Sequence, residues 1–236
     1  MEEKLSRLVE RLKSAFGDRL VAVVLYGSGG TEDWNKDSSD LNVLCVLSRI
    51  TPAELGLAEP ILHWWQKDGN PPPLLLTADE VPASTDCFPM EFHDMQRHRR
   101  VLYGSDVIAS ISVENKYYRA QLEHELRAKQ LRLRQRAAEV LSQPDRLRRL
   151  MTDSVSTFCV LGRHALILGG QPSYWKKQEV VAALANAIGS PLNGIDEILA
   201  LRTSGKRLTD GETVPLLERY LVDITALVRF VDAFGG

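Results

Sequence analysis

The sequence predicts an α/β domain in the N-terminal half of the chain and an all-helical domain after it. Two short apolar runs, at 20–26 and 41–47, are rich in β-branched residues and have the length of buried strands. A polar loop rich in Gly, Ser, Asp and Asn separates them. After about residue 112 the pattern changes to long stretches with apolar residues at helical spacing. We therefore expect two domains, residues 1–111 and residues 112–236.

Two helices are expected around the first two strands. Apolar residues recur three or four positions apart over 2–16, which is the spacing of one helix face. A second helix is expected from Thr51 to about Lys67, because Thr51 suits an N-cap and Glu54 completes a capping box. These helices supply apolar surface that can cover a sheet.

Two more strands are expected before the helical half begins. Residues 74–77 form a short apolar run after a segment rich in Pro and Gly. In 88–95, Phe and Met side chains alternate with polar ones, which predicts a strand with Glu91 on its polar face. The segment 101–104 then closes the α/β part.

The C-terminal half predicts a helical bundle. The first helix is marked by apolar residues at helical spacing within 122–137. The remaining helices are expected at 144–168, 177–188, 194–202 and 213–233. No internal repeat and no low-complexity linker interrupts this half.

Composition is that of an ordinary globular protein. The chain has 236 residues, is 44% apolar and 25% charged, and carries a formal net charge of -2, so no overall charge attracts it to nucleic acid or an anionic membrane. Its three cysteines are scattered without metal-ligand spacing, which favours small core residues in a reducing compartment. The N-terminus lacks the pattern of a signal peptide, and no stretch reaches the roughly 18 apolar residues of a membrane span. We therefore expect a cytoplasmic protein.

The polar residues at the ends of the first two strands have the chemistry of a metal and phosphate site. Asp40 directly precedes the second strand and Asn42 lies two residues on, so both side chains are expected on one face. Such a pair of oxygen ligands can hold Mg²⁺. The Gly27-Ser28 turn lets backbone N–H groups and a hydroxyl approach a phosphate closely. Glu91 is a candidate third acid, although a solvent-facing position on an alternating strand explains it as well.

The pattern of Gly27-Ser28, an intervening loop and then Ser39-Asp40-Leu41-Asn42 resembles the signature of the DNA polymerase β-like nucleotidyltransferase superfamily. Its aminoglycoside and minimal nucleotidyltransferase members are the most similar in kind. The likeness covers about residues 18–104, and the helical half resembles the domain that follows the catalytic domain in aminoglycoside-modifying members. It implies an α/β nucleotidyltransferase-like N-terminal domain with a small mixed sheet, and an all-α helical-bundle C-terminal domain.

The resemblance also implies a role for each motif residue. The implied reaction is Mg²⁺-dependent transfer of a nucleoside monophosphate from an NTP such as ATP to a hydroxyl acceptor, with the NTP as co-substrate. The implied residues are Gly27, Ser28 and Ser39 for nucleotide binding, Asp40 and Glu91 for catalysis, and Asp40, Asn42 and Glu91 for the metal.

Asn42 departs from the superfamily pattern, because active members carry Asp at this position. A neutral amide holds Mg²⁺ more weakly than a carboxylate does. Two interpretations therefore stay open: a nucleotidyltransferase with a weakened metal site, and a catalytically impaired nucleotide-binding or partner-binding regulatory module of the toxin–antitoxin kind. The acceptor, a small molecule or a protein, and a homodimer or a small partner protein are equally open.

A basic run between residues 127 and 149 allows two interpretations. It either faces the nucleotide phosphates or a polyanionic substrate, or it is a solvated helix face with ion pairs to neighbouring acids. The cations are Arg127, Lys129, Arg132, Arg134, Arg136, Arg146, Arg148 and Arg149.

Overall fold

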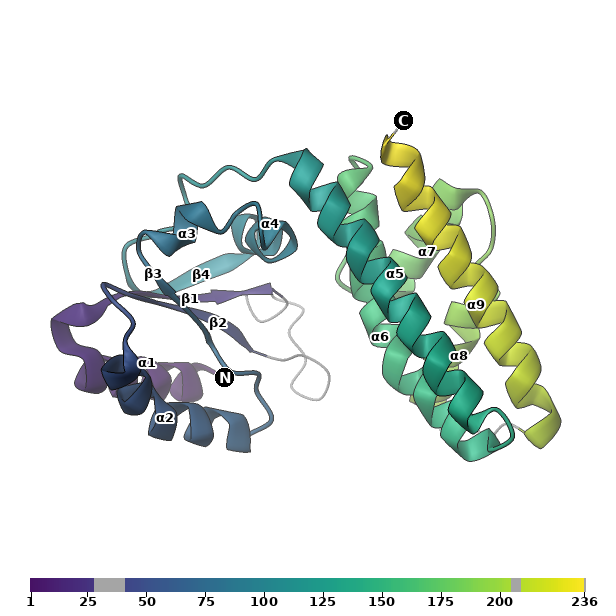
Figure 1. Cartoon of the computed structure of the whole chain (residues 1–236), viewed down its shortest axis with the longest axis horizontal. Helices are drawn as coiled ribbons and strands as arrows, with labels where there is room; N and C mark the ends of the chain where they lie inside the picture. Colours follow the sequence, from purple (N-terminus) through teal and green to yellow (C-terminus); the bar gives the residue numbers. More distant parts are fainter. Residues whose placement is uncertain (28–40, 205–208, 236) are drawn as a thin grey trace. The chain divides into compact units, whose positions relative to one another are not determined.

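The structure, a computed structural model, describes residues 1–27, 41–204 and 209–235. It divides into two compact units, Met1–Tyr117 and Tyr118–Gly236 (Figure 1). The first unit contains a four-stranded sheet with helices, and the described part of the second is helical.

The sheet is mixed and has the strand order β3-β2-β1-β4. Its strands are β1 (Leu20–Tyr26), β2 (Asn42–Leu47), β3 (Leu74–Thr77) and β4 (Arg99–Gly104). The central strand β1 is antiparallel to both β2 and β4, whereas β2 and β3 are parallel. Both apolar runs that predicted buried strands are therefore strands, and they pair directly with each other.

Helices cover both faces of the sheet (Figure 1). On one face lie α1 (Glu2–Phe16) and α2 (Pro52–Lys67), with the short 3-10 turn Gly17–Arg19 joining α1 to β1. On the other face lie α3 (Glu80–Ala83) and α4 (Pro89–Arg97). The alternation of β1 divides its side chains between the two cores: Leu20, Val23 and Leu25 pack toward α1 and α2, and Ala22 and Val24 toward α4.

The start of α2 is held by a capping box, as the sequence predicts. The Thr51 hydroxyl accepts from the Ala53 N–H at 3.2 Å, and the Thr51 N–H donates to Glu54 Oε2 at 3.1 Å. The buried Glu54 carboxylate also accepts from Arg19 at 2.8 Å and from Arg49 at 3.3 Å. Hydrogen bonds from Thr51 and then from the two arginines lower the pKa of Glu54 to about 2. This carboxylate joins the start of α2 to the start of β1.

The prediction of a strand at 88–95 is wrong, because most of this segment belongs to helix α4. The buried residues are Pro89, Phe92 and Met95, each three positions from the next, which is helical spacing. Phe88, one of the residues that suggested alternation, is 49% exposed. Pro89 occupies the first helical position, where its missing N–H costs nothing. The strand follows the helix as β4 and pairs with β1.

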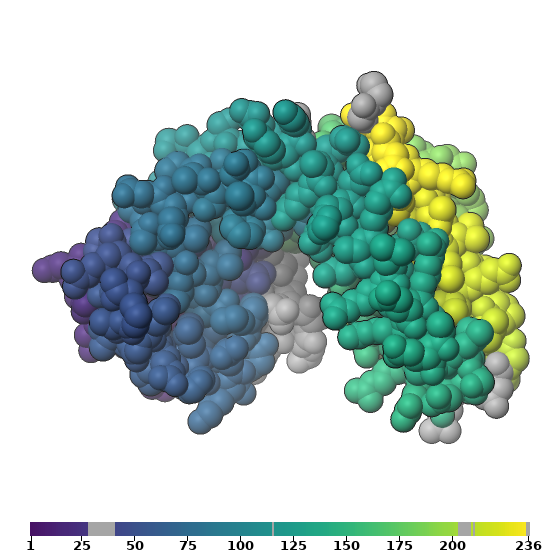
Figure 2. All heavy atoms as spheres, in the orientation of Figure 1, coloured from purple at the N-terminus to yellow at the C-terminus, as the bar shows by residue number. Residues whose placement is uncertain are grey.

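The helices expected in the C-terminal half are all present. They are α5 (Asn115–Val140), α6 (Pro144–Leu168), α7 (Lys177–Ile188), α8 (Asn193–Ser204) and α9 (Asp210–Asp232), with a final 3-10 turn at Ala233–Gly235. In the space-filling view, side chains of α5 and α9 form much of the visible face of this unit (Figure 2).

Two glycines allow close helix crossings inside the bundle. A Cβ on Gly162 of α6 would lie 2.4 Å from Leu184 Cδ1 of α7. A Cβ on Gly194 of α8 would lie 2.5 Å from the backbone nitrogen of Tyr220 on α9. Glycine at both positions lets the helices pack closer than any other residue would.

The cysteines are free thiols that differ in burial. Cys45 in β2 and Cys159 in α6 are buried, as expected, and burial raises the pKa of each to about 12. Cys87 is exposed, so the core position expected of the three holds for two of them. Among the helices in the described ranges, none is both long and apolar enough to cross a membrane.

Candidate functional site

Gly27 ends β1 in a conformation that requires glycine. Its φ is +72°, in the left-handed region that L-residues rarely adopt. Its N–H donates to the carbonyl of His98 at 3.2 Å, which ties the turn to the start of β4. A Cβ added here would lie 3.2 Å from Asn42 Nδ2. The turn and the Asn42 amide are therefore in close contact.

Asn42 lies on the sheet face that α4 covers. It is the first residue of β2 and pairs with Tyr26 in the antiparallel register. Directly opposite residues of an antiparallel pair project from the same face. That face carries Ala22 and Val24, which pack against Phe92 of α4. The partly buried amide of Asn42 is thus at the end of the sheet, beside Gly27 and beneath α4.

Helix α4 brings two carboxylates to the same end of the sheet. Glu91 is in its first turn, where a negative charge is favoured by the helix dipole, and Asp94 follows one turn later. Burial raises the pKa of Tyr26 far above its ordinary value, and the charges of Glu91 and then Asp94 raise it further. Both carboxylates therefore lie close enough to act on the phenol that pairs with Asn42.

The C-terminal end of α4 is fastened to β4 by Arg99. This guanidinium donates to the carbonyls of Met95 and Gln96, at 3.3 and 2.9 Å. It also forms a two-pronged ion pair with Asp106, with Nε–Oδ1 and Nη2–Oδ2 distances of 2.9 and 2.8 Å. Arg99 is the β4 residue opposite Tyr26, so its contacts with α4 and Asp106 hold this helix at the end of the sheet where Tyr26 and Asn42 lie.

Sequence reasoning missed Tyr26 and Asp94 as neighbours of Glu91. In a strand, residues three positions apart project from opposite faces, so the expected strand placed Asp94 away from Glu91. In a helix the same spacing places them on neighbouring positions of one side. The signal that would have found Asp94 is the helical spacing of Phe92 and Met95 behind Pro89.

The structure brings Gly27 and Asn42 together and places Glu91 on α4, near the Tyr26 that pairs with Asn42; the other motif residues lie outside the described ranges. These are Ser28, Ser39 and Asp40. Within the described ranges, no three His, Cys, Asp or Glu residues are grouped so as to hold a metal ion. The amide of Asn42 and the carboxylate of Glu91 are oxygen donors, the type of ligand that Mg²⁺ prefers.

Four cations of the basic run on α5 and α6 are paired with carboxylates. Arg127 bonds Glu123 at 3.0 Å and Asp232 at 2.8 Å, and Lys129 lies 3.4 Å from Glu125. Further pairs join Arg148 to Asp145 and Arg149 to Asp153. These contacts favour the interpretation of a solvated helix face for these four cations, because exposed pairs of this kind contribute little beyond local helix stability.

A comparison with solved structures finds a similar fold over nearly the whole chain. No protein-family model matches the chain, and no curated protein matches its sequence. The fold is similar to that of spectinomycin adenyltransferase AAD(9) from Enterococcus faecialis, solved with ATP and spectinomycin, with a TM-score of 0.63 and 16% identity over 98% of this chain and 99% of that one.

The chain has a nucleotidyltransferase fold. The likeness extends over the small mixed sheet with its helices and over the helical C-terminal region, as the resemblance implied.

Proposed function

We propose that the protein transfers a nucleoside monophosphate from an NTP to a hydroxyl acceptor, with Mg²⁺. The observation that carries this proposal is the approach of Gly27 to Asn42 at one end of the sheet, with Glu91 near Tyr26, the strand partner of Asn42. A tight turn, an oxygen donor and a carboxylate are the groups that phosphoryl chemistry of this kind uses. The fold of an adenyltransferase solved with ATP supports the same function.

In this proposal the α/β domain, residues 1–111, holds the nucleotide. Bound Mg²⁺ would neutralise the charge of the triphosphate and favour departure of pyrophosphate. The residues assigned are Gly27, Ser28 and Ser39 to the nucleotide, Asp40, Asn42 and Glu91 to the metal, and Asp40 and Glu91 to catalysis. The backbone N–H groups of a Gly-Ser turn can approach the phosphates because no Cβ stands at Gly27.

Glu91 is the proposed proton acceptor. The acceptor oxygen attacks the α-phosphorus, the bond to the bridging oxygen of pyrophosphate breaks, and the hydroxyl proton passes to the Glu91 carboxylate. Tyr26 cannot take this role at neutral pH, because burial and the two neighbouring carboxylates keep its phenol protonated. Tyr26 instead contributes a protonated hydroxyl beside the site.

A small, hydroxyl-bearing molecule is the acceptor to test first. The similar adenyltransferase was solved with spectinomycin, and the match extends over the helical region that follows its α/β domain. We therefore propose aminocyclitol and aminoglycoside antibiotics as the first acceptors to screen, with protein hydroxyls as the second class.

Asn42 favours a second candidate function, a catalytically impaired module that binds nucleotide or a partner protein for regulation. An amide contributes one oxygen and no charge, so this site holds a divalent cation more weakly than one with two aspartates. In that case nucleotide binds without turnover.

Turnover with an acceptor panel separates the two candidates. The protein would be incubated with each of the four NTPs, Mg²⁺ and spectinomycin or an aminoglycoside, and the mass gained by the acceptor and the release of pyrophosphate would be measured. We expect a gain of one nucleoside monophosphate that Glu91→Gln abolishes. Glu59→Gln, on the exposed side of α2, is the matched control. Nucleotide binding without transfer to any acceptor would favour the regulatory module.

A further inference from the structure

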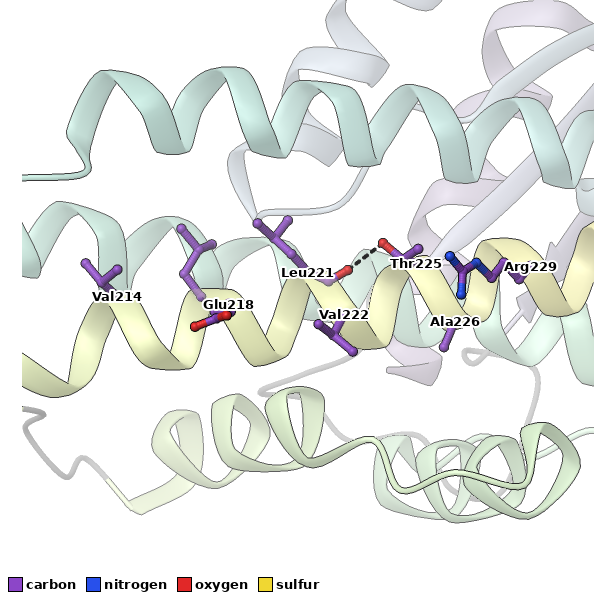
Figure 3. Close-up of a pocket in the computed structure, with 8 residues that line it drawn as sticks. Val214, Glu218, Leu221, Val222, Thr225, Ala226 and Arg229 are labelled. Atoms are coloured by element: carbon purple, nitrogen blue, oxygen red, sulfur yellow. Dashed lines mark hydrogen bonds between the residues drawn. The ribbon is translucent and has the colours of Figure 1, made fainter.

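One side of α9 carries a largely apolar stripe of eight residues, in which Glu218, Thr225 and Arg229 lie among five apolar side chains (Figure 3). Val214 is 46% exposed and Val222 is 64% exposed, and the partly buried Leu221 and Ala226 line the stripe as well. The stripe lines an open trough of about 570 Å³ whose lining residues all belong to α9. Contiguous exposed apolar surface of this kind marks an interaction surface, unlike single exposed apolar side chains.

Two opposite charges lie within the stripe, at either end of its central part. Glu218 and Arg229 are eleven residues apart, which is about 20° beyond three full turns and about 16 Å along the helix, so both lie on the face of the stripe. Within the described part of the chain neither forms an ion pair. Two other charges of α9 are paired, Arg219 with Glu197 at 2.6 Å and Asp232 with Arg127 at 2.8 Å.

We propose that this face binds the same face of a second copy of the chain, in an antiparallel helix pair with two-fold symmetry. A two-fold axis at the midpoint between Glu218 and Arg229 places each Glu218 opposite the partner's Arg229. The apolar centre of the stripe, formed by Leu221, Val222 and Ala226 between the two charges, then lies on the apolar centre of the partner. An isologous contact requires a self-complementary surface, and this arrangement of one acid, an apolar stretch and one base meets that requirement.

The order of the charges selects this geometry over a parallel one. A parallel pairing in register would place Glu218 against the partner's Glu218 and Arg229 against the partner's Arg229, and like charges in contact repel. The antiparallel pairing gives two attractive contacts at the rim of an apolar centre, which is the usual anatomy of an interface.

The association is expected to be weak and dependent on concentration. Stable interfaces commonly involve about 20–30 residues from each partner, whereas this face has eight lining residues. The inference does not rest on the proposed function, because none of the residues of the stripe belongs to the site on the first unit. A dimer without nucleotidyl transfer, or transfer by a monomer, is therefore a distinguishable result.

Sedimentation equilibrium of the full chain over a wide concentration range tests the pairing. We expect wild-type protein to shift toward a dimer as its concentration rises. Val222→Asp places a carboxylate at the apolar centre and should raise the dissociation constant at least about tenfold. Val160→Asp is the matched control, since Val160 on α6 is 44% exposed and lies outside the stripe, and it should leave the association unchanged. Circular dichroism confirms that each variant is folded.

A charge exchange tests the antiparallel geometry. Glu218→Arg and Arg229→Glu should each weaken the dimer, and the double variant should restore it, because both ion pairs are then present with reversed polarity. Only pairing between identical chains allows this restoration within one sequence. A wild-type chain that stays monomeric throughout, or a dimer that Val222→Asp does not weaken, would overturn the proposal. Failure of the double variant to recover would overturn the antiparallel arrangement.

Discussion

Replacing Gly27 by alanine tests both the strained turn and its contact with Asn42. The left-handed conformation at Gly27, with φ of +72°, costs an L-residue about 1–2 kcal/mol. The new Cβ would also lie 3.2 Å from Asn42 Nδ2, so the amide must move by a few tenths of an ångström. Gly27→Ala should therefore lower the free energy of unfolding by more than the conformational cost alone.

Gly69→Ala is the matched control for this variant. Gly69 has a φ of +82°, and no atom lies within 4 Å of its added Cβ. It carries the same conformational cost without the contact. Urea denaturation of both variants at one pH isolates the contribution of the Asn42 contact as the difference between them.

The same pair of variants separates stability from nucleotide binding. If the phosphates approach the turn where Gly27 has no Cβ, Gly27→Ala places a methyl group against them and should cost at least one charge-assisted hydrogen bond to the turn, worth about 1.5–3 kcal/mol, or about 10- to 100-fold in ATP affinity. Gly69→Ala should bind ATP as the wild type does. Equal stability losses for the two variants, together with unchanged ATP affinity of Gly27→Ala, would refute both the contact and the role of the turn.

Three further predictions concern other parts of the structure. Asn42→Asp should strengthen Mg²⁺-dependent nucleotide binding and raise turnover, as measured by titration and pyrophosphate release; no gain in either would count against Asn42 as a metal ligand. The pKa of Glu54 is lowered from 4.5 to about 2 in the folded protein, so the stabilising effect of its carboxylate is present above pH 4.5 and is lost as the pH falls toward 2. The free energies of unfolding of the wild type and of Glu54→Gln, measured by denaturation, should therefore converge over that pH range. Gly194→Ala should lower the free energy of unfolding by about 1–3 kcal/mol in a denaturant titration, because its Cβ would lie 2.5 Å from the backbone of Tyr220. Gly56→Ala on α2 is the control: its Cβ would meet open space, so the variant should be as stable as the wild type or more stable.

Most elements of the fold could be predicted because apolar periodicity decides them. The run at 20–26 is fully apolar and β-branched, which leaves little alternative to a buried strand, and the capping box at Thr51 marks the start of α2 directly. The prediction of a strand at 88–95 was wrong because the aromatic and Met residues of this segment fit both an alternating and a helical pattern. Tertiary packing decided between them: Phe92 and Met95 reach the core, and Phe88 does not.

The candidate site could be predicted in part. Gly27 and Asn42 could be placed together because they end and begin neighbouring strands, and the structure adds their direct contact. Glu91 lies near Tyr26, the strand partner of Asn42, but it belongs to a helix and not to a strand. The proximity of Asp94 to Tyr26 could not be deduced from the sequence, because it depends on the hydrogen bonds of Arg99 to α4 and to Asp106. These bonds join segments whose relation apolar periodicity does not reveal.

Calorimetric titration with ATP, with and without Mg²⁺, tests the central claim most directly. The account predicts binding that depends on Mg²⁺ in the wild type and is lost in Asp40→Ala, and binding that is strongly weakened in Glu91→Gln but unchanged in Glu59→Gln. Binding of ATP that is indifferent to Mg²⁺ and to Glu91, or no binding of any of the four NTPs at millimolar concentration, would contradict a nucleotide site at the junction of β1, β2 and α4.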